Sequence, residues 1–341
     1  MYFLSACRSS LTGNVFVTAL GRALALALAC SVWSAWPGGV GAQPAIKRIA
    51  IFYQDSGLSP RLDMFKEMMH AQGHVEGKDV EYVYHLAWPG RDDIDLAAER
   101  LVREGADLIF AVGTPPALAA RKASTTIPIL FYAADPIGTG LAESLAHPGG
   151  NATGIASLAE ELSSKRLEIL TEAAPKVKRI GVLANTGNPA TRRQLDAMEP
   201  AAKTLGVTLS IFPVSNNVQL GRALASLARK RVDAIFLTAD VVLNVHQKRI
   251  AGHALKAKLP TISPFAEFAR AGGLLFYGPD FRDVLRRCAA YAGRMLKGTA
   301  ASDLPVEQVS RFRLAVNLRT AKVLGLAMPE TIMVRAEEVV K

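Results

Sequence analysis

The stretch LIFAVGTPPALAARKASTTIPILFYAADP, residues 108–136, indicates the fold that the rest of the chain is expected to share. It contains two short apolar runs, Leu108–Val112 and Ile129–Ala133, which have the length and composition of buried strands. An Ala-rich, helix-like segment runs between them to Ser124. It opens with Thr114, predicted as the N-cap, and two Pro residues, which the first turn of a helix tolerates. The pattern predicts strand, helix, strand: one βαβ unit.

Polar residues follow both strands of this unit. Gly113 and Thr114 come after the first strand, and Asp135 comes after the second. In open parallel sheets, ligands bind beyond the carboxyl ends of the strands. These three residues therefore stand where a small ligand would be held.

The N-terminus is predicted to be a signal peptide, residues 1–42. Arg8 and Arg22 are its only charged residues, and the apolar run 23–32 has the length of a signal core but is short for a membrane span. Small residues before Gln43 place the cleavage after Ala42. The alternatives are a membrane anchor and a lipoprotein with lipid on Cys30, and both fit the sequence less well.

Length and composition limit the classes of protein that fit. Removal of residues 1–42 leaves 299 of the 341 residues and lowers the formal net charge of +10 by two. Such a chain buries a sizeable core without disulfides or metals, and Cys288, the only cysteine left, has no intrachain partner. The basic residues are scattered without aromatic neighbours, so we expect a solvated surface and no nucleic-acid partner.

The alternation of strand, helix and strand starts again after residue 150, which predicts two similar α/β lobes with parallel, doubly wound sheets. Elements left over after two lobes suggest that the chain crosses back between them as a hinge. Strands are expected at 46–53, 80–84, 108–112, 129–133, 151–157, 180–184, 208–213, 234–237 and 273–277, with a further short apolar segment at 259–263 and two strand-like pieces in 304–317. Helices are expected at 59–73, 92–104, 114–124, 137–145, 160–173, 191–205, 218–229, 244–256, 264–271, 281–296 and 319–324.

Catalytic signatures are missing from the sequence. It has no G-x-S-x-G elbow, no P-loop and no H-E-x-x-H motif. Gly138-Thr139-Gly140 opens like a dinucleotide fingerprint, but Glu143 stands at the third glycine position. Cys288 lies in a helix-like run and is expected to be structural rather than a nucleophile. We predict neither an enzyme, a cofactor nor a metal site.

Short motifs spread in order over nearly the whole mature chain carry a family resemblance. They include Gly113–Ala117, Thr126–Ile129, Asp135-Pro136, Pro148–Gly154, Lys165–Glu168, Gly272–Leu274, Tyr277–Pro279, Tyr291–Arg294, Leu296–Gly298, Leu304–Val306 and Ala321-Lys322. The chain resembles the substrate-binding proteins of ABC importers with the type I periplasmic-binding-protein fold, and within them the group that includes tryptophan- and tyrosine-binding members. The resemblance implies a protein that captures a small solute outside the inner membrane and delivers it to a permease.

The resemblance and the strand ends together predict the site and the lobes. The predicted ligand-binding residues are Gln54, Asp55, Thr114, Pro115, Asp135, Ser157, Asn185, Asp240, Glu267 and Tyr277. The predicted N-terminal lobe is 43–155 plus 280–303, and the predicted C-terminal lobe is 156–279 plus 304–341.

The chemistry of these residues suits an amino-acid-like ligand. Thr114 and the N–H groups of the helix after it would take a carboxylate, and Asp135 or Asp240 would take an ammonium group. Tyr53, Tyr132 and Phe265 would stack on an apolar part or are core residues. For any single residue, an N-cap role of Thr114, Asn185 or Asp240 is the simpler interpretation.

We therefore expect a monomeric periplasmic protein with a small-molecule ligand and ABC permease subunits in the inner membrane as partners. An exported module that senses a ligand for a membrane receptor is the alternative. An exported enzyme is a third hypothesis without a supporting motif.

Overall fold

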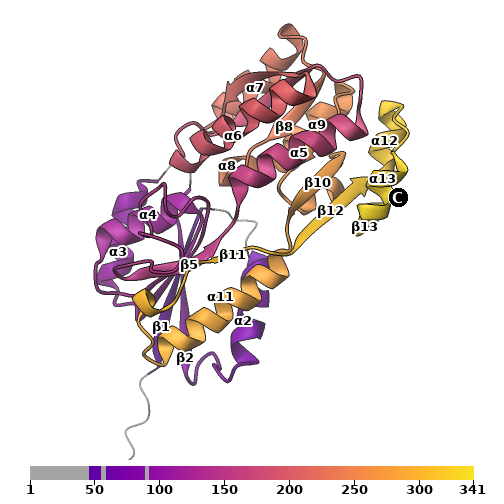
Figure 1. Cartoon of the computed structure of the whole chain (residues 1–341). Coiled ribbons are helices and arrows are strands. Elements are labelled where there is room, and N and C mark those ends of the chain that lie inside the picture. Colours follow the sequence, from indigo (N-terminus) through magenta and orange to yellow (C-terminus); the bar gives the residue numbers. More distant parts are fainter. Residues whose placement is uncertain (1–45, 55–58, 89–91) are drawn as a thin grey trace, which may run out of the picture. The chain divides into compact units, whose positions relative to one another are not determined.

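The structure, a computed structural model, describes residues 46–54, 59–88 and 92–341 (Figure 1). The predicted signal peptide with its cleavage site and Cys30, and the predicted ligand residue Asp55, lie outside the described residues. Within those residues, no helix combines the length and the apolar character that a membrane span requires.

The first sheet, sheet A, has the strand order β11-β5-β4-β3-β1-β2, and all of its pairs are parallel. The order reverses between β1 and β3, so this is the topological switch point of the sheet. Gly154 in β5 lies so close to β4 that an added Cβ would be 2.0 Å from the Phe131 carbonyl oxygen. The strands are β1 (Lys47–Tyr53), β2 (Val80–Leu86), β3 (Leu108–Val112), β4 (Ile129–Ala133), β5 (Ala152–Ala156) and β11 (Glu307–Gln308).

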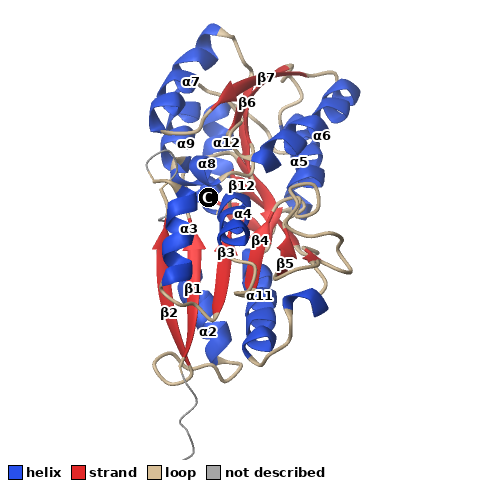
Figure 2. Cartoon of the chain, turned by 90° about the vertical axis from the view of Figure 1, so that its left-hand side faces the viewer, coloured by secondary structure: helices blue, strands red, loops and turns tan. Residues whose placement is uncertain are grey.

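Helices cover both faces of sheet A. On one face Phe65 stacks on Phe110 at a ring-centroid distance of 4.8 Å, in a core that also contains Cys288. On the other face, in front of the sheet in Figure 2, Leu101 and Ala120 pack in a second core. The first face carries α2 (Ser59–His70) and α11 (Phe281–Leu296), and the second carries α3 (Ile94–Arg103) and α4 (Thr114–Ala123).

The second sheet, sheet B, has the order β13-β12-β10-β9-β8-β6-β7, which repeats the arrangement of sheet A with its switch point between β6 and β8. One pair departs from the predicted all-parallel sheet: β10 and β12 are antiparallel. The segment 280–311 between them contributes α11 and β11 to sheet A. The strands are β6 (Arg179–Ala184), β7 (Thr208–Pro213), β8 (Ala234–Leu237), β9 (Thr261–Ser263), β10 (Leu275–Pro279), β12 (Phe312–Asn317) and β13 (Glu338–Val340).

Sheet B is also covered on both faces. Leu170 and Met198 belong to the core on one face, and Leu227 and Ile250 to the core on the other. The helices are α5 (Ala159–Ala173), α6 (Pro189–Leu205), α7 (Asn217–Arg229), α8 (Val241–Val245), α9 (Gln247–Lys256), α10 (Glu267–Arg270), α12 (Leu318–Leu324) and α13 (Glu330–Arg335), with a 3-10 turn at Ala301–Asp303. The mixed α/β class with two doubly wound sheets is therefore confirmed.

The chain passes between the two sheets at three points: between β5 and α5, between β10 and α11, and between β11 and β12 (Figure 1). The division into lobes stays a proposal, and the pairing suggests one change to it. Because β11 pairs with β5 of sheet A, we propose that the last boundary falls after Gln308 rather than after residue 303.

Two predicted elements differ from the structure. The segment 137–145 forms turns instead of a helix, since Asp135 has a φ of 44° and its carboxylate accepts a hydrogen bond from the Gly138 N–H. The single helix predicted at 244–256 is divided into α8 and α9 at His246. The last helix and strand, α13 and β13, were not predicted.

Candidate functional site

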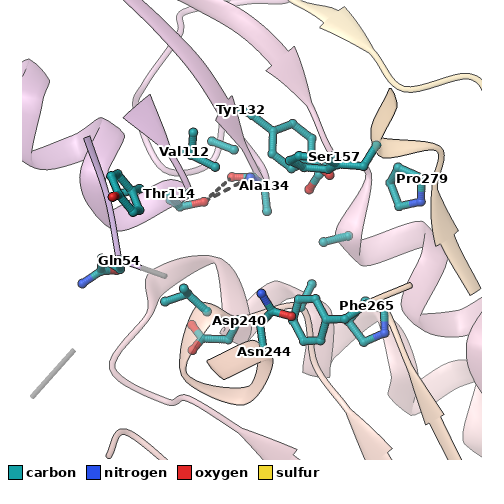
Figure 3. A pocket seen from close by; sticks show the side chains of 18 of the residues that line it. Gln54, Val112, Thr114, Tyr132, Ala134, Ser157, Asp240, Asn244, Phe265 and Pro279 are labelled. Atoms are coloured by element: carbon teal, nitrogen blue, oxygen red, sulfur yellow. Dashed lines mark hydrogen bonds between the residues drawn. The ribbon is translucent and has the colours of Figure 1, made fainter. Parts of the chain in front are cut away.

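A cavity of about 190 Å³ lies at the carboxyl ends of strands from both sheets. Residues that follow β1, β3, β4 and β5 line one side, and residues that follow β6, β8 and β9, with the end of β10, line the other. In Figure 3, Thr114, Tyr132 and Ser157 lie across the cavity from Asp240, Asn244 and Phe265. This position includes the switch points of both sheets, where α/β proteins bind ligands.

Thr114 fixes the wall formed by sheet A. Its hydroxyl donates to the Ala134 carbonyl and accepts from the Ala134 N–H, both at 3.1 Å (Figure 3). Gly113, with a φ of 109° in the region that favours glycine, is the residue at the N-cap position. Thr114 is thus the first residue of α4, and the predicted N-cap role is wrong: its side chain ties β3 to β4 instead.

The N-terminus of α4 is a weaker anion site than predicted. Pro115 and Pro116 have no N–H group, so of the first three helical residues only Thr114 has an amide that can donate. A carboxylate therefore needs another partner in this cavity.

Asp240 is the buried carboxylate of the opposite wall, with 3 % of its surface exposed. It accepts hydrogen bonds from the Val242 N–H at 2.9 Å, from Asn188 at 2.8 Å and from Asn185 at 3.1 Å. Burial raises its pKa, and the three donors act against that shift. Asp240 is the N-cap residue of α8, as the simpler interpretation of the sequence predicted, and it also lines the cavity.

Arg166 on α5 lines the cavity and is only 1 % exposed. Its Nε donates to the Tyr277 carbonyl at 2.7 Å, and Nη1 lies 3.5 Å from the Ser163 hydroxyl. Burial lowers its pKa to about 10, so the side chain is still a cation at neutral pH. Among the described residues, no carboxylate forms an ion pair with it.

Aromatic rings form much of the remaining lining. Tyr53, Tyr132, Phe265, Phe276 and Phe281 all border the cavity. Tyr132 packs edge-on against Phe281 at a centroid distance of 5.5 Å, so it is both a lining and a packing residue. These rings offer flat apolar surface to a ligand.

Two ion pairs join the elements of sheet A to those of sheet B beside the cavity. Arg61 of α2 pairs with Glu267 of α10 and lies over the Phe281 ring. Asp135, after β4, pairs with Arg193 of α6 at 2.7 Å. The Arg61 guanidinium outweighs the burial of Glu267 and holds the pKa of that carboxyl below its ordinary value.

Of the ten predicted ligand residues, six line the cavity: Gln54, Thr114, Pro115, Ser157, Asp240 and Glu267.

Three predicted residues have other places, and Asp55 lies outside the described residues. Asp135 is held by Arg193 and the Gly138 N–H. Asn185 lies behind Asp240 as its donor, and the Tyr277 ring packs on the sheet B core while its carbonyl accepts from Arg166.

The cavity lining also includes Arg61, Arg166 and Asn188, which were not among the predicted residues. A signal existed for Arg166: it falls at helical spacing with Leu162 and Leu170, which are buried, so a charge stands on the apolar stripe of α5. Cys288, in contrast, is buried in α11 as predicted, and burial raises the pKa of its thiol. Among the described residues, no group of three or more His, Cys, Asp and Glu side chains is placed to hold a metal.

Two doubly wound α/β sheets with a lined cavity at their carboxyl ends define a two-lobed binding protein of the type I periplasmic-binding-protein class. The family model described as "ABC transporter substrate binding protein" matches residues 45–340, and the chain belongs to this family. It is a family of binding proteins rather than of enzymes, with small-molecule ligands and ABC transporters as its partners.

Three similar proteins illustrate the relationship. A tyrosine-binding protein of Clostridioides difficile (strain R20291) is 28 % identical over 273 residues, 78 % of each chain. A Streptococcus pneumonia ABC domain in complex with L-Trp is 22 % identical with a TM-score of 0.79, over 87 % of this chain and 100 % of that one. A ligand-free, open substrate binding protein with adhesive properties from Clostridium difficile is 25 % identical with a TM-score of 0.62, over the same shares.

Proposed function

We propose that this protein captures a small, amino-acid-like solute in the cavity, closes its two lobes over it, and delivers it to the permease subunits of an ABC importer. The single observation that supports this most is the composition of the cavity wall, to which both sheets contribute the residues that follow their strands. A solute held there would contact both lobes at once, and hinge closure is the ordinary way in which such proteins enclose a ligand.

The cross-lobe ion pairs support closure as the way in which the solute is enclosed. Arg61–Glu267 and Asp135–Arg193 join elements that a hinge movement would separate. The higher TM-score against the L-Trp complex than against the ligand-free, open protein agrees with a lobe arrangement of the closed kind.

The printed names of two relatives, a tyrosine-binding protein and an L-Trp complex, support an amino-acid-like solute. The aromatic rings of the cavity wall suit a solute with an aromatic side chain. Asp240 would accept its ammonium group through a charge-assisted hydrogen bond. We further propose that the protein works as a monomer in the periplasm after cleavage of residues 1–42. The family match, which begins at residue 45, is consistent with that leader.

The test is a thermal-shift screen of the protein purified without residues 1–42 against amino acids, sugars, amines and small organic acids, followed by calorimetry. A solute that binds only the folded state raises the melting temperature, by an amount that grows with its concentration relative to Kd. A saturable shift with an amino acid supports the proposal. Failure of every solute to shift the melting temperature would refute it.

The ligand-sensing alternative uses the same cavity and differs only in its partner. Uptake of the identified solute, measured in cells that carry the gene and in cells from which it is deleted, separates the two. Loss of uptake on deletion would favour delivery to a permease. Uptake that is unchanged by deletion would favour sensing.

A further inference from the structure

Among the residues that the structure describes, four charged side chains line the cavity: Arg61, Arg166, Asp240 and Glu267. Arg61 and Glu267 neutralise each other in the ion pair described above. Asp240 has the three donors that a buried carboxylate needs. Of the charged side chains in the described wall, Arg166 therefore has the fewest ion-pair and hydrogen-bond partners relative to what its charge requires.

The contacts of Arg166 leave most of its hydrogen-bonding capacity unused. A guanidinium has five N–H donors in a planar fork, and the structure gives it one carbonyl at 2.7 Å and one hydroxyl at 3.5 Å. Both contacts are to neutral oxygens. A side chain that only tied α5 to β10 would not need a charge, and burial of an unmatched charge is costly.

The geometry points to Arg166 as the residue that binds an anionic group of the ligand, and we propose that this group is a carboxylate. The inference rests on the proposed solute-binding function and deepens it by naming the ligand class, small carboxylic acids. A planar carboxylate matches the fork of a guanidinium. It also meets the need left by Pro115 and Pro116, which remove amides from the helix N-terminus in the same cavity.

The charge of the whole cavity selects against more highly charged anions. Asp240 lines the same cavity and would repel a phosphate or a dicarboxylate. Such a ligand carries two negative charges, and Arg166 is the one cation of the described wall without an ion-pair partner. A single carboxylate on a ligand that also carries an ammonium group satisfies both Arg166 and Asp240. The aromatic lining accepts the rest of such a molecule.

The test compares each carboxylic acid with its uncharged amide on the wild-type protein. The probes are L-tryptophan with L-tryptophanamide, L-tyrosine with L-tyrosinamide, and 3-indolepropionic acid with its amide, followed by the remaining amino acids of the screen. Calorimetry at one pH and ionic strength gives each Kd. We expect the acid of a binding pair to bind about 100-fold more tightly than the amide, since hydrogen bonds to charged groups are the strong ones.

Variants tie the effect to this side chain. Arg166→Gln is expected to weaken binding of the acid about 100-fold and to leave the amide nearly unchanged, so that the preference disappears. Arg166→Lys keeps the positive charge and loses the planar fork of donors. Its Kd for the acid is expected to lie between those of the wild type and Arg166→Gln. Arg192→Gln, an exposed arginine of α6 that pairs with Asp196 of its own helix, is the control and should bind as wild type. If circular dichroism shows that Arg166→Gln does not fold, the acid–amide comparison on the wild type decides.

The outcomes separate this inference from the proposed function. Tight binding of acids and weak binding of their amides supports it. Equal binding of acid and amide, or tight binding of a solute without a carboxylate, overturns the inference and leaves the solute-binding function standing. No binding of any solute overturns both.

Discussion

Replacing Arg193 by Gln is expected to weaken ligand binding although Arg193 does not line the cavity. Its Nε lies 2.7 Å from Oδ2 of Asp135, and the pair joins α6 to the loop after β4. The Asp135 side chain is 12 % exposed and that of Arg193 is 52 % exposed, so solvent screens much of the attraction. For such a half-exposed pair we take the upper end of the stabilisation that solvent-exposed ion pairs provide, about 1 kcal/mol. If the pair forms only when the lobes are closed, this amount is lost from the closed state and Kd rises about fivefold.

Calorimetry with the solute found in the screen measures this change. Arg192→Gln is the matched control, because Arg192 is the neighbouring residue and its partner Asp196 lies in the same helix, so its loss does not affect closure. Asp135→Asn and the double variant complete a cycle whose coupling energy isolates the pair from the other bond of Asp135. The effect should shrink in 1 M salt. An unchanged Kd for Arg193→Gln, or an equal change for Arg192→Gln, would refute the reasoning.

Three further predictions concern Thr114 and Asp240 in the cavity walls and the packing of Gly154 in sheet A. Thr114→Val removes both hydrogen bonds to Ala134 and should lower the free energy of unfolding by about 2 kcal/mol in urea titrations, whereas Thr114→Ser should keep most of it. Gly154→Ala should cost about 3 kcal/mol because its Cβ would meet the β4 backbone at 2.0 Å, and Gly252→Ala, which meets nothing within 4 Å, should be neutral or stabilising; equal effects would contradict this. Because burial raises the pKa of Asp240, the native state keeps a proton that the unfolded chain releases as pH rises above 3.8. Its contribution to the free energy of unfolding should therefore fall from pH 3.8 up to the raised pKa, a slope that Asp240→Asn should lack in melts across that range.

The strands could be predicted from the sequence because their apolar runs are short, continuous and bounded by polar turns. Leu108–Val112 and Ile180–Ala184 are both strands in the structure, the second beginning one residue earlier. The turn segment 137–145 misled the prediction because Ile137, Leu141 and Leu145 recur at helical spacing. Ile137 is 45 % exposed, and the backbone at Asp135 fixes a turn that spacing alone does not reveal.

The cavity could be predicted in outline from the sequence but not in its charges. Polar residues after parallel strands meet at one edge of a sheet, so Thr114 and Asp240 were found. Asp135 occupies an equivalent position, yet its carboxylate is directed by Arg193 and the Gly138 N–H, partners that only the folded chain brings together. Arg166 lies within a helix, and no strand-end rule applies to it.

A crystal structure of the protein with the solute identified by calorimetry tests the central claim most directly. We predict density for the solute between the two sheets, with its carboxylate against Arg166 and its amino group facing Asp240. Density for the solute outside this cavity, or within it but touching residues of one lobe alone, would contradict the account.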